Sequence, residues 1–236
     1  RAAQEPEKLK QLRALFESEA EQYGIYPLRD ASSKRSGDYS VPHSLEGHTK
    51  MTYTTVHTRM PESSVINLKN VSHRITADII INEGAANGVI ACQGGNMAGW
   101  SLYLNEEGKP SYLYNWFGHE LTLLESKAAP GAGEHELIVE YLHDGGFAAG
   151  GIVTLLIDGV LVEEKRIEKT VPVIFSMSGE TFDVGRDTGS PVGPYPHNFP
   201  FTGDIVGVTL ERLSETTVEV KQAEIKGRFE AGLSSQ

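Results

Sequence analysis

The stretch that decides the fold class reads Trp100-Ser-Leu-Tyr-Leu-Asn-Glu-Glu-Gly-Lys-Pro-Ser-Tyr-Leu-Tyr114. Two runs of aromatic and aliphatic residues flank the turn residues Asn105 to Gly108, which is the pattern of a β-hairpin. A second hairpin is indicated where Asp158-Gly159 separates Ile-Val-Thr-Leu-Leu-Ile from Val-Leu-Val-Glu-Glu. Both segments predict antiparallel strand pairing.

Outward from these hairpins, short runs of strand-forming residues alternate with turn signals over most of the chain. The predicted strands are Met51–His57, His73–Ile81, Gly88–Gln93, Trp100–Leu104, Ser111–Asn115, Leu121–Ser126, His135–His143, Ile152–Asp158, Leu161–Ile167, Val173–Met177 and Asp204–Arg212. With 25 Gly and 11 Pro among 236 residues, this pattern favours an all-β chain. Roughly ten to twelve strands suit a jelly-roll or lectin-like antiparallel β-sandwich better than an immunoglobulin-like one.

The sequence predicts four parts. Residues Glu5–Tyr23 indicate an amphipathic α-helix, because Pro6 suits a first turn and apolar residues recur at helical spacing. The parts are a helical region 1–28, a linker 29–49 rich in Ser, Gly, Pro, Lys and His, the β-sandwich 50–212 and a C-terminal extension 213–236. The apolar helix face needs a cover, so a preceding domain, the sandwich or a homo-oligomer are alternatives.

Composition excludes several partners. A formal net charge of −11, from 32 acidic and 21 basic residues, repels nucleic acids and anionic lipid surfaces, so neither partner is expected. No run approaches the roughly 20 apolar residues of a membrane-spanning helix.

Cys92, the single cysteine, is expected to be a buried thiol. The start at Arg1, without Met or an apolar leader, indicates a processed product or a fragment.

Catalytic patterns are missing from the sequence. Glu134, Glu136 and Glu140 share one strand face, as the carboxylates of a sandwich glycosidase do, but Leu137 and Val139 between them form the core face. We therefore expect solvated strand carboxylates and predict no catalytic residue. None of the eight histidines stands in a His-Glu-x-x-His or Cys/His zinc spacing, so we expect surface or half-buried histidines.

Aromatic and amide residues next to glycine turns are the candidate ligand contacts. The predicted pocket-lining residues are Asn96, Met97, Asn115, Trp116, Phe117 and His119. Aromatic rings beside amides stack on and hydrogen-bond to sugars or aryl groups. The alternative is core packing at the rim of the sandwich, which we expect for Trp100 because it alternates with Leu102 and Leu104.

One loop is a candidate metal site. Asp183 and Asp187 flank the turn at Gly185, and hard oxygen ligands on a loop are what calcium prefers. The alternative is that both carboxylates accept hydrogen bonds from their own turn, which Asp commonly does.

Stretches over most of the length share a family likeness. They are Glu5–Leu12, Glu19-Ala-Glu-Gln-Tyr-Gly-Ile-Tyr-Pro-Leu28, Asn70–Ala77, Gln93–Gly95, Gly99–Tyr103, Tyr114–Gly118 and Glu180-Thr-Phe-Asp-Val-Gly-Arg-Asp-Thr-Gly-Ser-Pro-Val192. They resemble the C-terminal region of bacterial arylsulfatases of the type-I sulfatase family. The resemblance implies a concanavalin A- or laminin G-like sandwich, with residues 1–28 ending a sulfatase-type catalytic body.

The resemblance further implies the non-catalytic portion of a sulfuric ester hydrolase, which shapes the active-site mouth of an N-terminal catalytic domain outside this sequence. That partner domain would hold calcium and act on a sulfated small molecule or glycan. The Cys/Ser-x-Pro-x-Arg motif of the family is missing, because Gly94 and Asn96 follow Cys92, and Ser40-Val-Pro42-His-Ser44 lacks the arginine. We expect this chain to be inactive alone; the alternative function is an independent carbohydrate-binding, lectin-like module.

Overall fold

The computed structural model describes residues 4–26, 45, 47–176, 179–214 and 217–223. The chain divides into two compact units, residues 1–43 and 44–236, each of which is described by itself. The predicted linker 29–49 and extension 213–236 lie mostly outside the described residues. No helix among the described residues is long and apolar enough to cross a bilayer.

The first unit contains helix α1 (Pro6–Gln22), one residue shorter at each end than predicted. Pro6 occupies its first turn, and the backbone N–H of Tyr23 donates to Glu19 O at its end. In this described segment Ala20 is the one buried side chain, whereas Leu12 and Phe16 are 53% and 45% exposed. The helix therefore presents an apolar face to solvent within its own unit.

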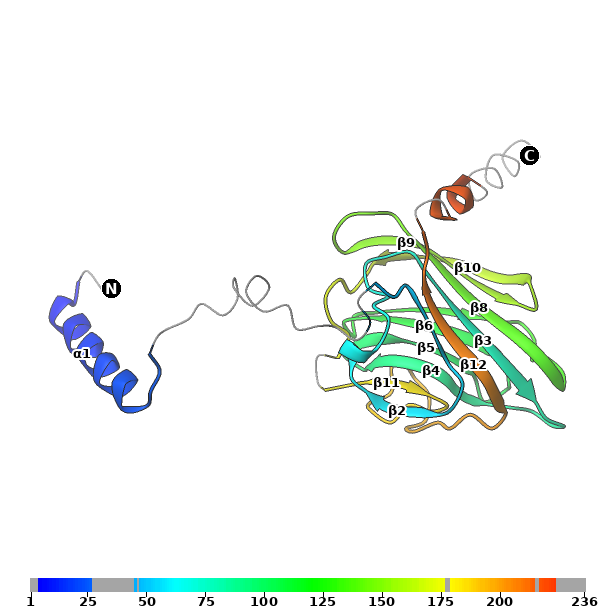
Figure 1. Cartoon of the computed structure of the whole chain (residues 1–236), viewed down its shortest axis with the longest axis horizontal. Helices are drawn as coiled ribbons and strands as arrows, with labels where there is room; N and C mark the ends of the chain where they lie inside the picture. Colours follow the sequence, from blue (N-terminus) through cyan, green and yellow to red (C-terminus); the bar gives the residue numbers. More distant parts are fainter. Residues whose placement is uncertain (1–3, 27–44, 46, 177–178, 215–216, 224–236) are drawn as a thin grey trace. The chain divides into compact units, whose positions relative to one another are not determined.

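The second unit is a sandwich of two six-stranded antiparallel sheets (Figure 1). Sheet A has the order β1 (Lys50–Tyr53), β12 (Asp204–Arg212), β3 (His73–Ile81), β8 (Gly133–His143), β9 (Ala149–Ile157), β10 (Val160–Lys169). Sheet B has the order β2 (His57–Met60), β11 (Phe182–Val184), β4 (Gly88–Gly95), β5 (Ala98–Leu104), β6 (Pro110–Trp116), β7 (Glu120–Glu125). The predicted antiparallel β-sandwich behind one helix is confirmed.

Both predicted hairpins are confirmed. At the β5–β6 turn, Gly108 N donates to Asn105 O at 2.9 Å, and the Asn105 side chain accepts from the N–H groups of Glu107 and Lys109. Between β9 and β10, Asp158 and Gly159 have φ angles of 50° and 76°. These left-handed conformations are what Asp-Gly supplies in a tight turn.

Two strand predictions are wrong. Met51–His57 was predicted as one strand, but β1 pairs with β12 in sheet A and β2 pairs with β11 in sheet B, so the chain crosses between the sheets. Val173–Met177 forms no strand over its described residues, because the N–H groups of Phe175 and Ser176 donate to the carboxylate of Glu62 in a 3-10 helix, Glu62–Ser64. The three-residue β11 was not predicted.

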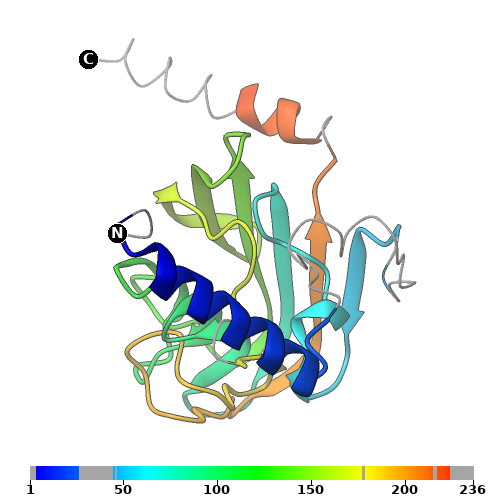
Figure 2. The ribbon, with the colours of Figure 1, turned by 90° about the vertical axis from the view of Figure 1, so that its left-hand side faces the viewer.

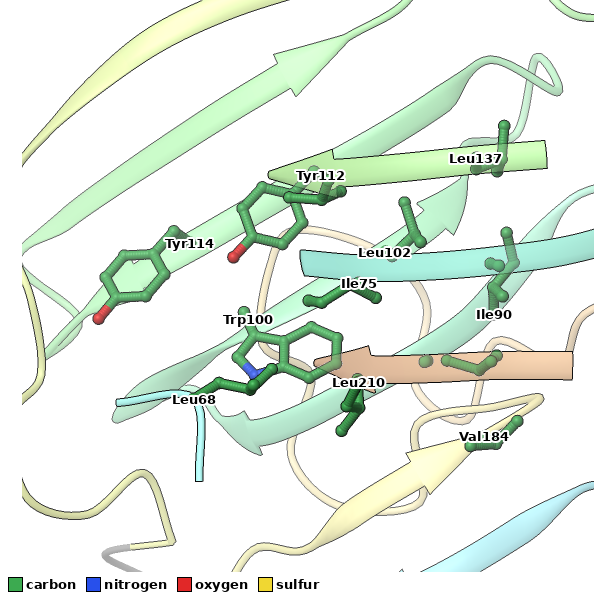
Figure 3. Close-up of a cluster of buried hydrophobic side chains, with 14 of the residues drawn as sticks. Leu68, Ile75, Ile90, Trp100, Leu102, Tyr112, Tyr114, Leu137, Val184 and Leu210 are labelled. Atoms are coloured by element: carbon green, nitrogen blue, oxygen red, sulfur yellow. The ribbon is translucent and has the colours of Figure 1, made fainter. Parts of the chain in front are cut away.

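The main core lies between the sheets (Figure 3). Trp100 belongs to it, as predicted, since it is 1% exposed and its Nε1 donates to Gln93 Oε1 at 3.3 Å. A smaller second core lies on the other face of sheet B. Its buried members are Val89, Cys92, Tyr103, Leu113, Val192 and Phe199. The last two come from the β11–β12 connection, which explains why β4, β5 and β6 are buried on both faces.

The C-terminal part continues from β12 into a short helical segment, residues 217–223, drawn in orange to red in Figure 2. Lys221 Nζ of this segment lies 2.7 Å from Glu140 Oε2 on β8. Arg74 Nε of β3 also donates to the Glu140 carboxylate, at 2.8 Å. Glu140 on β8 is therefore a paired carboxylate that links strand β3 and the helical segment 217–223 to sheet A.

Candidate functional site

Two hairpin tips of sheet B are held together by one buried amide. Asn96 and Met97 connect β4 to β5, and residues 117–119 connect β6 to β7. Asn115, 2% exposed, donates from Nδ2 to Asn96 O at 3.2 Å and Val192 O at 2.9 Å. Its Oδ1 accepts from Gly118 N at 2.8 Å. Asn115 thus positions the tips rather than presenting its amide to a ligand.

Three aromatic side chains, one methionine and one lysine gather at these tips. We call this group the tip cluster: Met97, Trp116, Phe117, His119 and Lys169. The Trp116 ring centroid lies 5.5 Å from that of Phe117 and 6.1 Å from that of His119. Lys169, the last residue of β10 in the opposite sheet, places Nζ 5.2 Å from the Trp116 ring centroid. The tip cluster therefore joins both sheets at one end of the sandwich.

The tip cluster is open to solvent to different degrees. His119 and Lys169 are exposed, Met97 is 43% exposed, and Trp116 and Phe117 are half-buried against the main core. The two aromatic rings are thus anchored by packing against the core and remain partly exposed, and Lys169 Nζ lies over the Trp116 ring. A rigid aromatic surface of this kind loses little side-chain entropy on binding.

The backbone of Phe117 is strained. Its φ of 51° lies in the left-handed region, as does the φ of 67° at Gly118. For a bulky residue this conformation costs roughly 1–2 kcal/mol. The bond from Gly118 N to Asn115 Oδ1 and the bond from His119 N to Trp116 O, 3.0 Å, hold the turn in this shape. Strain of this kind clusters at functional sites.

A third segment supports the β4–β5 tip. Ser190 Oγ lies within hydrogen-bond distance of Asn96 Oδ1, 3.1 Å, and of Glu180 Oε1, 2.7 Å. A Cβ on Gly189 would lie 1.8 Å from Glu180 Oε2, so a larger residue there would displace the Glu180 carboxylate. Within the described residues, Asn96 Nδ2 has no hydrogen-bond partner, and Asn96 is exposed. It is a free donor beside the tip cluster.

The predicted calcium loop does not fit a calcium ion. Ligand atoms of Asp183, Asp187 and Cys92 lie within 4.8 Å of one another, and all three residues are buried. Asp183 Oδ2 already accepts from the N and Oγ1 of Thr188, at 2.7 and 2.6 Å. Asp187 Oδ2 accepts from Tyr195 OH at 2.7 Å. Calcium takes six to eight oxygens, whereas this group offers two hydrogen-bonded carboxylates and a thiol.

Ionisation supports the same conclusion. Burial raises the pKa of the Cys92 thiol well above its usual value, and the nearby Asp187 and Asp183 raise it further. Burial also raises the pKa of Asp187, while the bond from Tyr195 lowers it. A protonated thiol is a poor metal ligand and a poor nucleophile. The loop is a structural support for the second core.

A cavity that the sequence did not predict lies at the opposite end of the sandwich. Its volume is about 450 Å³, and it is lined by Asp78, Ile79, Glu134, His135, Glu136, Asp158 and Val206. His135 Nδ1 lies 2.8 Å from Asp158 Oδ2, and this bond lowers the pKa of Asp158. Of the three strand carboxylates expected to be solvated, Glu134 and Glu136 are exposed, whereas Glu140 is buried and paired with Arg74.

The sequence missed Lys169 at the tips and the cross-strand pair of Asp78 and Glu136 in the cavity. Lys169 is far from Trp116 in the sequence, and no local motif marks it. Asp78 and Glu136 are partners in the β3–β8 register, which follows from strand order alone. A sequence pattern could have found either one only if the strand pairing were known.

Comparison with known proteins gives fold-level neighbours. No family model and no curated protein matches the chain. The CBM40 module of Ruminococcus gnavus IT-sialidase, solved with α2,3-sialyllactose, has a TM-score of 0.42 and 17% identity, over 64% of this chain and 82% of its own. Mouse laminin α1 domains LG4-5 have a TM-score of 0.37 and 18% identity, over 61% and 39%.

The leech intramolecular trans-sialidase, solved with 2,7-anhydro-Neu5Ac, has a TM-score of 0.46 and 12% identity, over 72% of this chain and 26% of its own. All these TM-scores are below 0.5, so no ligand or activity is transferred from them. The strands and their pairing in this chain place it among all-β proteins, as an antiparallel sandwich of two six-stranded sheets.

Proposed function

We propose that the chain is a non-catalytic carbohydrate-binding module whose tip cluster contacts the glycan. The observation that carries this proposal is the placement of Phe117 and His119 on one locked hairpin tip, with ring centroids 5.5 and 6.1 Å from that of Trp116 at the end of β6. Sugars present apolar ring faces edged by hydroxyl groups. The aromatic rings supply the stacking surface, and the free Nδ2 of Asn96 supplies a hydrogen-bond donor.

Binding, rather than hydrolysis, suits this site. A glycosidase needs two carboxylic groups facing each other across the scissile bond, and the tip cluster contains no such pair. Met97, Phe117 and His119 lie on tips that are fixed by buried hydrogen bonds to Asn115, so this part of the surface is formed before a ligand arrives. Loops held by a rigid scaffold are where proteins place recognition residues.

The second candidate is the one implied by the arylsulfatase resemblance: an accessory portion of a sulfuric ester hydrolase. The exposed apolar face of α1, with Leu12, Leu15 and Phe16 about half exposed, favours it, because such a face is stabilised by a covering partner. On this proposal an N-terminal sulfatase catalytic domain covers the helix and holds the calcium. The tip cluster would then contribute to the mouth of that active site.

Glycan binding is tested by titration of the chain against an array of neutral, sulfated and carboxylated glycans, followed by calorimetry on the tightest. We expect Trp116→Ala to weaken binding about tenfold, the equivalent of roughly 1.4 kcal/mol of lost stacking and burial. Val160→Ala, at the opposite end of β10 and 64% exposed, is the matched control and should bind as the unsubstituted chain does. If Trp116→Ala bound the glycan as tightly as the unsubstituted chain, the tip cluster would be excluded as the glycan-binding site.

The accessory-portion candidate has its own assay. Hydrolysis of a chromogenic aryl sulfate is measured with added calcium, on the chain alone and on the longest natural product of its gene. Activity only in the longer protein supports the second candidate. Activity in the chain alone would contradict the proposal that the module is non-catalytic.

A further inference from the structure

We infer that the tip cluster selects anionic glycans, and that the Lys169 ammonium group recognises a sulfate ester or a carboxylate on the sugar. This inference rests on the proposed function and names the ligand class of the same site. The first observation is the position of Lys169: its Nζ lies over the Trp116 ring, 5.2 Å from the ring centroid. A sugar stacked on the tip cluster would bring its substituents next to this charge.

The second observation is that the charge is not neutralised. No carboxylate of the described residues lies within ion-pair distance of Lys169, whereas Lys50, Lys165 and Lys221 each pair with a glutamate. The ring quadrupole of Trp116 attracts the ammonium group but leaves its net charge intact. Lys169 is thus oriented by Trp116 while its positive charge stays available to a ligand.

Three acidic residues of the same region form no ion pair with Lys169. Glu168, the preceding residue, lies 3.2 Å from Arg166 Nε and is paired with it. Glu120 stands opposite Trp116 on β7 and is exposed, without an ion pair to Lys169. Glu180 accepts from Ser190 at the β4–β5 tip. These acids would oppose an anion, so the selection depends on how close Lys169 approaches it.

The overall charge of −11 does not exclude such a ligand. Exposed charges separated by more than about 8 Å are largely screened at physiological ionic strength, so the local cation governs the contact. A charge-assisted hydrogen bond from an ammonium group to a sulfate or carboxylate oxygen is stronger than a neutral one. Sulfate esters and carboxylates share this chemistry, and the experiment separates them.

The test uses the full chain and glycans in matched sets: one neutral oligosaccharide, its sulfated form and its uronic-acid form. We expect at least one anionic form to bind about tenfold more tightly than the neutral form, with a difference that shrinks as NaCl is raised. Lys169→Gln should abolish the difference, and Lys169→Arg should retain most of it. Lys127→Gln removes an exposed lysine at the opposite end of the sandwich and is the control.

The outcomes separate the inference from the proposed function. Tighter anionic binding that depends on Lys169 but not on Lys127 supports the inference, and the preferred form identifies sulfate or carboxylate as the source of the charge. Equal binding of neutral and anionic forms, unchanged in Lys169→Gln, overturns the inference and leaves glycan binding intact. No binding of any glycan overturns both. Thermal unfolding of each variant shows whether a loss reflects misfolding.

Discussion

His73 shows how one buried side chain makes the sandwich sensitive to acid. It lies on the inner face of β3, with its ring centroid 5.3 Å from that of Tyr141 and Nδ1 2.9 Å from Val71 O. Burial, with a smaller contribution from the nearby His143, lowers its pKa from the ordinary 6.5 to about 4, although the bond to Val71 O opposes this shift. The charged form is thus disfavoured in the folded protein and not in the unfolded chain.

The first prediction concerns this pKa. The unfolded chain takes up a proton near pH 6.5 and the folded protein only near pH 4, so stability falls as the pH drops between these values. The loss is about 3 kcal/mol, from 1.36 kcal/mol per pKa unit. Urea unfolding at pH 7, 5.5 and 4 measures it. His73→Phe should flatten the pH dependence of the free energy of unfolding, whereas His197→Asn, at an exposed site, should leave it unchanged. If His73→Phe loses as much stability between pH 7 and pH 4 as the unsubstituted chain, His73 is not the group responsible.

Asn115 and Trp116 are neighbours in sequence with different roles. The sequence placed both in a ligand pocket because an amide stood next to an aromatic ring. In the structure, alternation along β6 and the meeting of two tips bury Asn115 among backbone groups and leave Trp116 half-buried at the rim. Composition drew attention to this segment, but the direction of each side chain depended on the strand pairing.

At the scale of the elements, β3 and β8 carry a like-charged pair. Asp78 and Glu136 are direct partners in the register, and both are exposed. Side chains directly opposite on one face lie about 5 Å apart at Cβ, so the two carboxylates repel each other. No local turn brings Asp78 and Glu136 together, because four strands separate β3 from β8 in the sequence.

The second prediction follows from that repulsion. Asp78→Lys replaces it with an attraction, and we expect stability to rise by about 0.5 kcal/mol. The measurement is the midpoint of urea unfolding at low ionic strength, repeated at high salt, where the gain should shrink. In a Glu136→Gln background the same substitution should gain less. An equal gain in both backgrounds would rule out the cross-strand interaction as its cause.

Hairpins closed by local turns were predicted well, as were β3 and β12, whose bounds are those predicted. The β5–β6 and β9–β10 hairpins follow from Asn105–Gly108 and Asp158-Gly159, whose conformations are local. Strand β11 and the break between β1 and β2 were missed, because they depend on partners far along the chain. In the apolar run at 173–176, the backbone N–H groups of Phe175 and Ser176 donate to Glu62 instead of to a neighbouring strand.

At the scale of the whole molecule, residues 1–43 and 44–236 are separate compact units. The third prediction is that a chain starting at Ser44 unfolds within about 2 °C of the full chain, since both sandwich cores are built from residues after 44. Calorimetry measures the two unfolding temperatures. A helix of 17 residues is marginal alone, so α1 should contribute little to cooperativity. A drop of more than about 5 °C would show that α1 stabilises the sandwich.

The sequence by itself determined the all-β class, the β5–β6 and β9–β10 hairpins, the burial of Trp100 and the aromatic segment at residues 115–119. These follow from alternation and turn chemistry, which act over a few residues. The tertiary structure alone decided that Lys169 contacts Trp116 and that Asn115 is buried. It also decided that Asp183 and Asp187 accept hydrogen bonds from Thr188 and Tyr195. Those contacts join residues distant along the chain, and they arise only when the strand order brings them together.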